Sequence, residues 1–386
     1  MWGLISIITY YRILVADYFL QTLYYGIMNN DHLVKYAQLL TSYCCNIQAG
    51  QRVLIRSSYL AEPLILACQK EILLRGAMCE LSIGLDQIQR QYYDYSSDEQ
   101  LDQVPALYQY AVEHFDAIIS ISAPHDLYEL KGADEAKIAR HQSALKPIKT
   151  TMMQRSNQGA LKWVICNYPT DSLARAANMS LNDYTQFILD ACFLTTDEPV
   201  SEWQTLSADQ ERYVQRLNQA ESIRFKADHV DITFSTKERC WINSDGQRNM
   251  PSGEVFTSPV ENSGNGVITF THPSLLFGEV IQDLTLTIQD GVVVDWQTNN
   301  GRALLDRLFE IDGANKIGEI AIGTNYSIKE PTLNTLFDEK IGGTIHMAVG
   351  ASYPETGGLN QSSIHHDFVT QFNSNSAVLL DGDMIY

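Results

Sequence analysis

The order of apolar and polar residues predicts different structures in the two halves of the chain. In the first half, short apolar runs alternate with stretches whose apolar residues recur every three to four positions, as in 32–45. Strands that alternate with helices are typical of an α/β domain with a mostly parallel sheet. We therefore expect strands at 52–57, 79–84, 117–123 and 162–168, and helices at 32–45, 62–75, 97–114, 126–143 and 170–191.

The pattern changes after an acidic, polar stretch at 196–222, which has helical periodicity and reads as a connecting helix. Beyond it, short alternating runs separated by turns predict β structure. The Gln289-Asp290-Gly291 turn between two such runs predicts a hairpin. We place a boundary near 215, which gives an α/β domain (28–215) and a β-rich α+β domain (216–386). The expected β runs are 230–236, 240–246, 253–259, 266–273 and 284–298, followed by a helix at 301–309.

The residues with the strongest chemical character lie in the second domain, inside apolar runs with glycine beside them. Burying such residues is costly unless they are paired, hydrogen-bonded or bound to metal. His365 and Asp367 are two positions apart, so in a strand they project side by side, while His366 points the other way and is not counted as a ligand. The candidate site residues are Glu254, Glu319, His346, Tyr353, His365 and Asp367.

Carboxylates and imidazoles without thiolates fit zinc, cobalt or manganese. Three carboxylates and two imidazoles are too many for one tetrahedral ion with an open position, so they suit two ions about 3.5–4 Å apart that share a carboxylate and a bridging water. Simpler roles for the single residues stay open at this point. His346 alone could be a core histidine, Glu254 and Glu319 could be turn residues, and Tyr353 could be a half-buried loop aromatic.

Several motifs resemble the M29 family of metallo-aminopeptidases, which includes the aminopeptidase T and aminopeptidase S enzymes. They are GEVFTSP (253–259), GEIAIGTN (318–325), FDEKIGGTIHMAVG (337–350), SYPETGG (352–358) and IHHDFV (364–369), and the resemblance extends from about residue 28 onward. His366 departs from the apolar or aromatic residue common at that position in relatives.

The resemblance implies a role for each candidate residue. Glu254, Glu319, His346, His365 and Asp367 would be ligands of two divalent metal ions, with Glu319 as the bridging ligand and Glu254 as a ligand or proton acceptor. Tyr353 would act in catalysis, where its phenol could donate a hydrogen bond to the developing oxyanion. The resemblance also implies a homodimer and peptide substrates with a free N-terminus.

Charge and cysteine content restrict the partners and the compartment. The net charge of −19 argues against nucleic acid or an anionic membrane surface as a partner, because phosphates would be repelled. The seven cysteines form no C-x-x-C motif and predict reduced thiols in a cytoplasmic protein.

Residues 1–27 form an apolar, aromatic segment that Arg12 and Asp17 interrupt, so no uncharged run reaches the roughly 18 residues that a spanning helix needs. We interpret it as an atypical extension upstream of a natural start at Met28, with a membrane anchor as the less favoured alternative. The end of the chain, LLDGDMIY, is expected to be shorter than in relatives by a short strand.

The sequence therefore predicts a metallo-aminopeptidase that uses a metal-activated bridging water. Two further hypotheses are another metal-dependent amidohydrolase and a non-catalytic peptide- or metal-binding relative.

Overall fold

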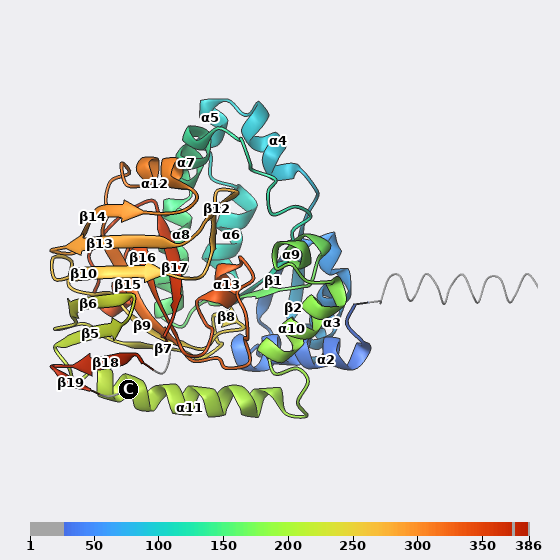
Figure 1. Ribbon diagram of the computed structural model, residues 1–386. Helices are drawn as coiled ribbons and strands as arrows, with labels where there is room; N and C mark the ends of the chain where they lie inside the picture. Colours follow the sequence, from blue (N-terminus) through green and yellow to red (C-terminus); the bar gives the residue numbers. More distant parts are fainter. Residues whose placement is uncertain (1–26, 373–374, 385–386) are drawn as a thin grey trace, which may run out of the picture.

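The computed structural model describes residues 27–372 and 375–384, so residues 1–26 of the predicted extension lie outside it. A region rich in helices packs beside a region rich in strands, and the long helix α11 (Pro199–Leu217) runs beneath both (Figure 1). Within the described residues, no helix combines the length and the apolar character that a membrane crossing requires.

The first region contains the predicted parallel sheet. Its strand order is β2-β1-β3-β4-β8, and every neighbouring pair is parallel. The inner strands are apolar because helices cover both faces, and Val53 and Ile55 are completely buried. The strands are β1 (Arg52–Ser58), β2 (Met78–Gly84), β3 (Ala117–Ser122), β4 (Lys162–Asn167) and β8 (Asn249–Met250).

Several predicted helices are interrupted in the structure. The helix expected at 97–114 breaks before Pro105, because a residue that precedes proline disfavours the helical conformation. The helix expected at 126–143 begins only after Asp134, whose carboxylate caps it. The helix expected at 170–191 breaks at Asn178, which has a positive φ of 55°.

Two helices, α4 and α8, were not predicted, and the first predicted helix ends in a π-helical turn, Leu39–Cys44. The helices of this region are α2 (Asn30–Gln38), α3 (Glu62–Leu74), α4 (Ile88–Tyr95), α5 (Asp98–Leu101), α6 (Ala106–His114), α7 (Glu135–Ala144), α8 (Lys146–Asn157), α9 (Asp171–Ala176) and α10 (Leu181–Ala191).

The second region holds two larger antiparallel sheets and a small hairpin. A seven-stranded sheet has the order β14-β13-β10-β6-β5-β18-β19, a five-stranded sheet has the order β17-β16-β15-β9-β7, and β11 pairs with β12. The predicted hairpin is confirmed, and both turn residues, Asp290 and Gly291, have positive φ values of 49° and 75°.

The strands of the seven-stranded sheet are β5 (Ser222–Ala227), β6 (Val230–Ser235), β10 (Asn265–Phe270), β13 (Leu284–Gln289), β14 (Val292–Gln297), β18 (Ala377–Leu380) and β19 (Asp383–Met384). The remaining elements are β7 (Ile242–Ser244), β9 (Glu254–Thr257), β11 (Ser274–Leu276), β12 (Glu279–Ile281), β15 (Ile317–Gly323), β16 (Thr344–Gly350), β17 (His365–Gln371), α12 (Arg302–Leu308) and α13 (Thr335–Asp338).

The two antiparallel sheets share one apolar core. Ile320, Ile345, Met347 and Phe368 from the five-stranded sheet join Phe225, Ile232, Ile268 and Leu286 from the seven-stranded sheet in that core. Side chains alternate between the two faces of a strand, so the residues next to these in sequence project from the outer face. That outer face carries the candidate site.

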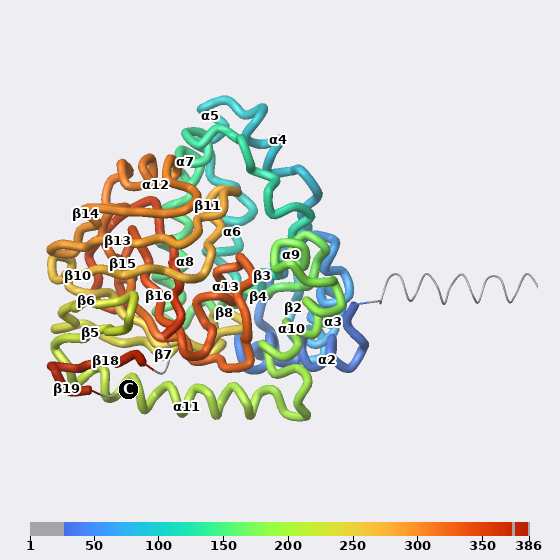
Figure 2. Tube along the Cα trace, viewed as in Figure 1, coloured from blue at the N-terminus to red at the C-terminus, as the bar shows by residue number. Residues whose placement is uncertain are grey.

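Two segments tie the regions together. β8 belongs to the parallel sheet although it follows α11 in the sequence. Only three residues separate β8 from β9, which belongs to the five-stranded sheet. The loop between β15 and β16 carries Ile328, Phe337 and Ile341 into the core of the first region, where Phe337 lies against Tyr184 and Phe187. Figure 2 shows α13 of this loop between the two regions.

Candidate metal centre

The candidate residues project from one face of four neighbouring strands. Glu319 on β15, Ala348 on β16 and Asp367 on β17 are paired in register across the sheet. His346 pairs with Ala321, in the adjoining row. Residues directly paired across antiparallel strands lie on the same face. The other two ligand candidates on this face are paired with glycines: Glu254 with Gly323 and His365 with Gly350.

Small residues between the candidates leave room for the longer side chains to converge. Ala321 and Ala348 are completely buried beneath them. Gly323 cannot be replaced without strain, because a Cβ there would lie 2.2 Å from the Ile341 carbonyl oxygen. The strand framework thus holds the acidic and imidazole groups over a floor of small side chains.

The five predicted ligands come together in the structure. His346 Nε2 lies 3.0 Å from Glu254 Oε2 and 3.6 Å from Glu319 Oε1. His365 Nε2 lies 3.2 Å from Glu319 Oε2 and 3.7 Å from Asp367 Oδ2. Two ligand groups result, each with all its ligand atoms within 4.8 Å of one another: one is Glu254, Glu319 and His346, the other Glu319, His365 and Asp367. Glu319 belongs to both groups and directs a different oxygen to each histidine.

The donor atoms of this cluster fit a metal better than they fit one another. Glu254 Oε2, both ring nitrogens of His346 and Asp367 Oδ1 are buried, and they have no hydrogen-bond partner within residues 27–372 and 375–384. The close approach of His346 to Glu254 therefore lacks hydrogen-bond geometry. Buried polar atoms without partners are costly, and cations placed between these oxygens and nitrogens would satisfy them. Carboxylate and imidazole donors suit zinc, cobalt or manganese.

The electrostatics of the cluster favour charged carboxylates. Burial alone would raise the pKa of Glu254, but the nearby Lys340 ammonium and His346 hold it below its ordinary value. Burial would likewise raise the pKa of Glu319, and His346 and His365 lower it. Burial would lower the pKa values of the histidines, yet the carboxylates raise the pKa of His346 to about 10 and that of His365 to about 9. Without metal, the cluster is thus a set of carboxylates neutralised by protonated imidazoles.

Neighbouring residues on β17 face opposite ways, as the alternation predicts. His365 Nδ1 donates to the Ala351 carbonyl oxygen at 2.8 Å, which leaves its Nε2 directed at the cluster. His366 points away, and its Nε2 lies 2.7 Å from Ser274 Oγ. Burial lowers the pKa of His366 to about 4, so this ring stays neutral.

Tyr353 lies beside the cluster, on the loop that follows β16. Its ring packs edge-on against His365, with the ring centroids 4.9 Å apart, and also lies against Phe256. Burial, followed by the charges of Glu319 and Asp367, raises the pKa of Tyr353 well above its ordinary value. The phenol is therefore protonated and able to donate a hydrogen bond.

Sequence reasoning missed Lys340 and Glu339, which complete the cluster. Lys340 is completely buried, and its Nζ lies 3.2 Å from Glu254 Oε1 and also contacts Glu339. A Glu339 oxygen lies within 4.8 Å of ligand atoms of His346 and Asp367. The Asp-Glu-Lys run stood inside the motif FDEKIGGTIHMAVG, but no role was assigned to it. The only signal was that apolar residues border it on both sides.

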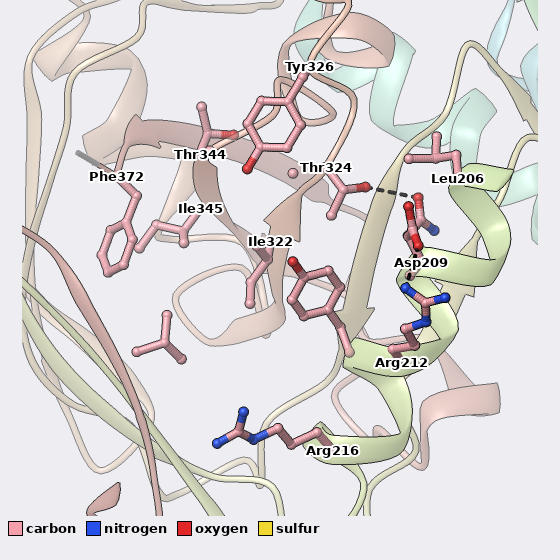
Figure 3. Close-up of a pocket in the computed structure, with 15 residues that line it drawn as sticks. Leu206, Asp209, Arg212, Arg216, Ile322, Thr324, Tyr326, Thr344, Ile345 and Phe372 are labelled. Atoms are coloured by element: carbon pink, nitrogen blue, oxygen red, sulfur yellow. Dashed lines mark hydrogen bonds and ion pairs between the residues drawn. The ribbon is translucent and has the colours of Figure 1, made fainter. Parts of the chain in front are cut away.

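A large pocket and His125 both lie apart from the cluster. The 590 Å³ pocket in Figure 3 lies between α11 and the side of the sheet that carries Ile322 and Ile345, opposite the face of Glu319 and His346. His125, on the loop after β3, is half-buried against Tyr59, with ring centroids 4.8 Å apart.

Comparison with known proteins identifies the family. The profile of the thermophilic metalloprotease (M29) family matches residues 29–383, which is nearly all of the chain. The chain belongs to the M29 family of metalloproteases. The resemblance drawn from the motifs is thereby confirmed.

Individual M29 relatives match over similar lengths. Aminopeptidase AmpS of Bacillus subtilis is 27% identical, over 88% of this chain and 92% of that protein. Aminopeptidase 2 of Geobacillus stearothermophilus is 29% identical, over 87% of this chain and 91% of that protein. The solved structure of wild-type AmpT from Thermus thermophilus superposes with a TM-score of 0.78 at 22% identity, over 92% of this chain and 99% of that one. This M29 chain therefore has the AmpT fold: a parallel sheet with helices, followed by antiparallel sheets.

Proposed function

We propose that this M29 metallo-aminopeptidase removes N-terminal residues from peptides at a centre of two divalent metal ions. Glu254, Glu319, His346, His365 and Asp367 would hold the ions. The observation that carries the proposal is that Glu319 directs one carboxylate oxygen to His346 and the other to His365, which belong to different ligand groups. A carboxylate shared in this way is typical of two-metal hydrolytic sites.

When bound, the ions would polarise the scissile carbonyl group and make a water molecule nucleophilic near neutral pH. The chain's own groups supply the rest. The Tyr353 phenol, kept protonated by burial and by the surrounding carboxylates, would donate to the oxyanion as the carbonyl carbon becomes tetrahedral. The Glu339 carboxylate, which is not among the five predicted ligands, is within reach of the same space and is a candidate to accept the proton of the attacking water.

Lys340 would act as a positioning residue. Its ammonium group contacts one oxygen of Glu254 and leaves the other oxygen directed at His346. It also adds a positive charge to a cluster with four carboxylates, which lowers the cost of burying them. Glu254 would therefore be presented to a metal through one fixed oxygen.

Three measurements test the function. Elemental analysis of the native protein is expected to find two ions per chain and to identify them as zinc, cobalt or manganese. Chelation is expected to abolish release of an N-terminal residue, and one of these metals is expected to restore it. A panel of amino-acyl chromogenic amides and their N-blocked counterparts separates aminopeptidase from general amidase activity, because equal cleavage of the blocked substrates would contradict the aminopeptidase assignment.

We also propose that the protein is cytoplasmic and forms a homodimer. All seven cysteines are unpaired and six are at least partly buried, as expected for a protein kept in a reducing compartment. Light scattering that gives twice the mass of one chain would support the dimer, and a single-chain mass would contradict it.

A further inference from the structure

A second cavity, of 780 Å³, lies at the carboxyl ends of the parallel strands β1, β2 and β3. Following the chain, β2 lies on one side of β1, whereas β3 and then β4 lie on the other side. In open α/β sheets, ligands bind in the crevice where the strand order reverses in this way. The position of the cavity is thus that of a ligand site, and it is distinct from the metal centre.

The floor of the cavity is a row of residues paired in register across the sheet. Arg56 on β1 pairs with Ser82 on β2 and with Ser120 on β3, and Ser120 pairs with Ile165 on β4. All four line the cavity. The row therefore presents one guanidinium group flanked by two hydroxyl groups.

Arg56 is available for an anion. Among the described residues, no carboxylate pairs with it, and its guanidinium carbon lies 3.9 Å from the centroid of the Tyr108 ring. The two acidic residues in the wall are already engaged, because Glu129 accepts from the backbone N–H groups of Gln89 and Arg90, and Asp126 accepts from that of Tyr128. In a chain with a net charge of −19, an arginine without a carboxylate partner in a cavity indicates an anionic ligand.

Other wall groups suit a ligand with both polar and apolar parts. His125, at the carboxyl end of β3, has a buried Nε2 atom that finds no hydrogen-bond partner in the part of the chain that the structure describes. The opposite wall is apolar and comes from α7 and from the β11–β12 hairpin of the second region, through Ile138, Leu275 and Phe277. An organic carboxylate with an apolar body fits these walls, and its charge would lie at Arg56.

The same row leads toward the metal centre. Ile165 pairs with Asn249 on β8, and Glu254 lies just beyond the carboxyl end of that strand. Next to Asn249, Arg248 forms an ion pair of 3.0 Å with Glu355, two residues from Tyr353. From β1 to β8 there are three strand spacings, or about 14 Å. An extended peptide of about four residues covers the distance to β8. Because Glu254 lies beyond that strand, four residues is about the shortest peptide that could span both sites.

We propose that this cavity receives the C-terminal carboxylate of short peptide substrates, and that Arg56 is the residue that recognises it. The inference rests on the aminopeptidase function, since it requires a peptide whose N-terminus lies at the metal centre. It makes the enzyme prefer free peptides of about four residues over shorter peptides and over segments of longer chains.

Leucyl-alanine peptides of two to eight residues, each made as the free acid and as the C-terminal amide, test the proposal. The measured quantity is kcat/KM for release of the first residue. For wild-type protein, the ratio of acid to amide is expected to peak at about tenfold near four residues and to approach one for dipeptides and octapeptides. A ratio that stays flat with length would overturn the proposal.

Variants locate the effect. Arg56→Met is expected to bring the acid-to-amide ratio to about one by lowering kcat/KM for the free acids about tenfold. Arg52→Met is the matched control: it makes the same change on the same strand, at the opposite end of the sheet. Ser122→Leu places a larger side chain in the cavity from an exposed strand end. It should lower the acid-to-amide ratio without removing the stacking of Arg56 on Tyr108. Retention of the ratio in both cavity variants would rule Arg56 out.

A binding measurement separates this proposal from the aminopeptidase function. N-acetylated tetrapeptides cannot be cleaved by an aminopeptidase, so calorimetry can compare their acid and amide forms. Suppose that no unblocked peptide is cleaved, but that the acid form of the blocked peptide binds about tenfold more tightly than the amide and Arg56→Met removes this difference. The proposed aminopeptidase function would then be contradicted, whereas the proposed carboxylate site would be supported. Equal binding of acid and amide removes the site. Free L-leucine that binds as tightly as the tetrapeptide, and loses binding in Arg56→Met, would assign the cavity to the product amino acid instead.

Discussion

The candidate metal cluster and the Arg56 cavity both contain charged side chains, but they are built in different ways. The cluster takes its side chains from the interiors of strands, where Glu254, Glu319 and Asp367 are almost completely buried and surrounded by countercharges. The cavity takes its groups from strand ends and loops and is open to solvent, and its Arg56 has no carboxylate partner among the described residues. A rigid, buried site suits ions that must be held in one geometry, whereas an open site suits a ligand that must enter and leave.

The largest expected effect comes from removing the shared carboxylate. Glu319→Gln keeps the shape but loses the charge that both ligand groups use, so kcat/KM should fall by at least about 10³-fold. The metal content should fall as well, as measured by elemental analysis. Glu310→Gln, at an exposed position, serves as the control and should behave as wild type. A fully active, fully loaded Glu319→Gln protein would contradict the shared role.

Lys340→Met tests whether the buried cluster depends on its internal cation. Two carboxylates would lose a buried counterion, which typically costs about 3–5 kcal/mol. The loss in free energy of unfolding should be largest in metal-free protein, because bound divalent ions supply positive charge. Urea unfolding with and without metal measures this loss. The control Lys237→Met breaks an exposed ion pair with Glu221 and should cost about 1 kcal/mol or less. Equal losses in metal-free and metal-loaded Lys340→Met would argue against this role.

The raised pKa values of His346 and His365 predict a pH dependence that is confined to metal-free protein. A group whose folded pKa lies above its unfolded value stabilises the fold below the unfolded value, near 6.5, and this contribution disappears as the pH rises through the folded value. Metal-free protein should therefore lose stability between about pH 7 and pH 10, while loaded protein should not.

The same protonation should appear in metal binding. At pH 7.5, loading is expected to release about two protons per chain, because both imidazoles must become neutral to act as ligands. Calorimetry in buffers with different ionisation enthalpies counts them. Release of no protons would mean that the imidazoles are neutral before the metal arrives.

The smallest expected effect comes from replacing His366, which lies behind the cluster. His366→Ala removes the contact with Ser274 Oγ and an edge-on contact with Phe368, but no ligand atom. Metal affinity should weaken by about tenfold or less, as is typical for residues that support ligands indirectly. Ser274→Ala should reproduce part of this loss. An effect as large as that of Glu319→Gln would mean that His366 itself takes part in binding.

The sequence predicted the parts of the molecule that depend on local pattern. The alternation around His365 and Asp367 gave the correct face, and charged residues inside apolar runs pointed to the cluster. The two-residue strand β8 was not predicted, because so short a segment becomes a strand only through its partner β4. The helix α8 was missed because its sequence, KPIKTTMMQRSN, is mostly polar and lacks a clear apolar stripe.

The remaining functional groups were hidden for a related reason. Lys340 stands in a charged run that resembles a surface turn, and only the fold of the β15–β16 loop shows that it is buried. Ser82, Ser120 and Arg56 are ordinary residues near the ends of strands, and their common row exists only once the strands are in register. Groups brought together solely by tertiary contacts leave no trace in local periodicity.

The passage from β8 to β9 has a consequence for any attempt to dissect the molecule. Only residues 251–253 separate a strand of one region from Glu254, and Asn325 Nδ2 ties Ser252 to Ala191 through their carbonyl oxygens. A fragment that begins at residue 216 would carry every predicted ligand and still lack the anchor that orients the first of them. Such a fragment should stay metal-free on its own and recover metal only when the missing half is added back, which would make metal loading a property of the two halves together.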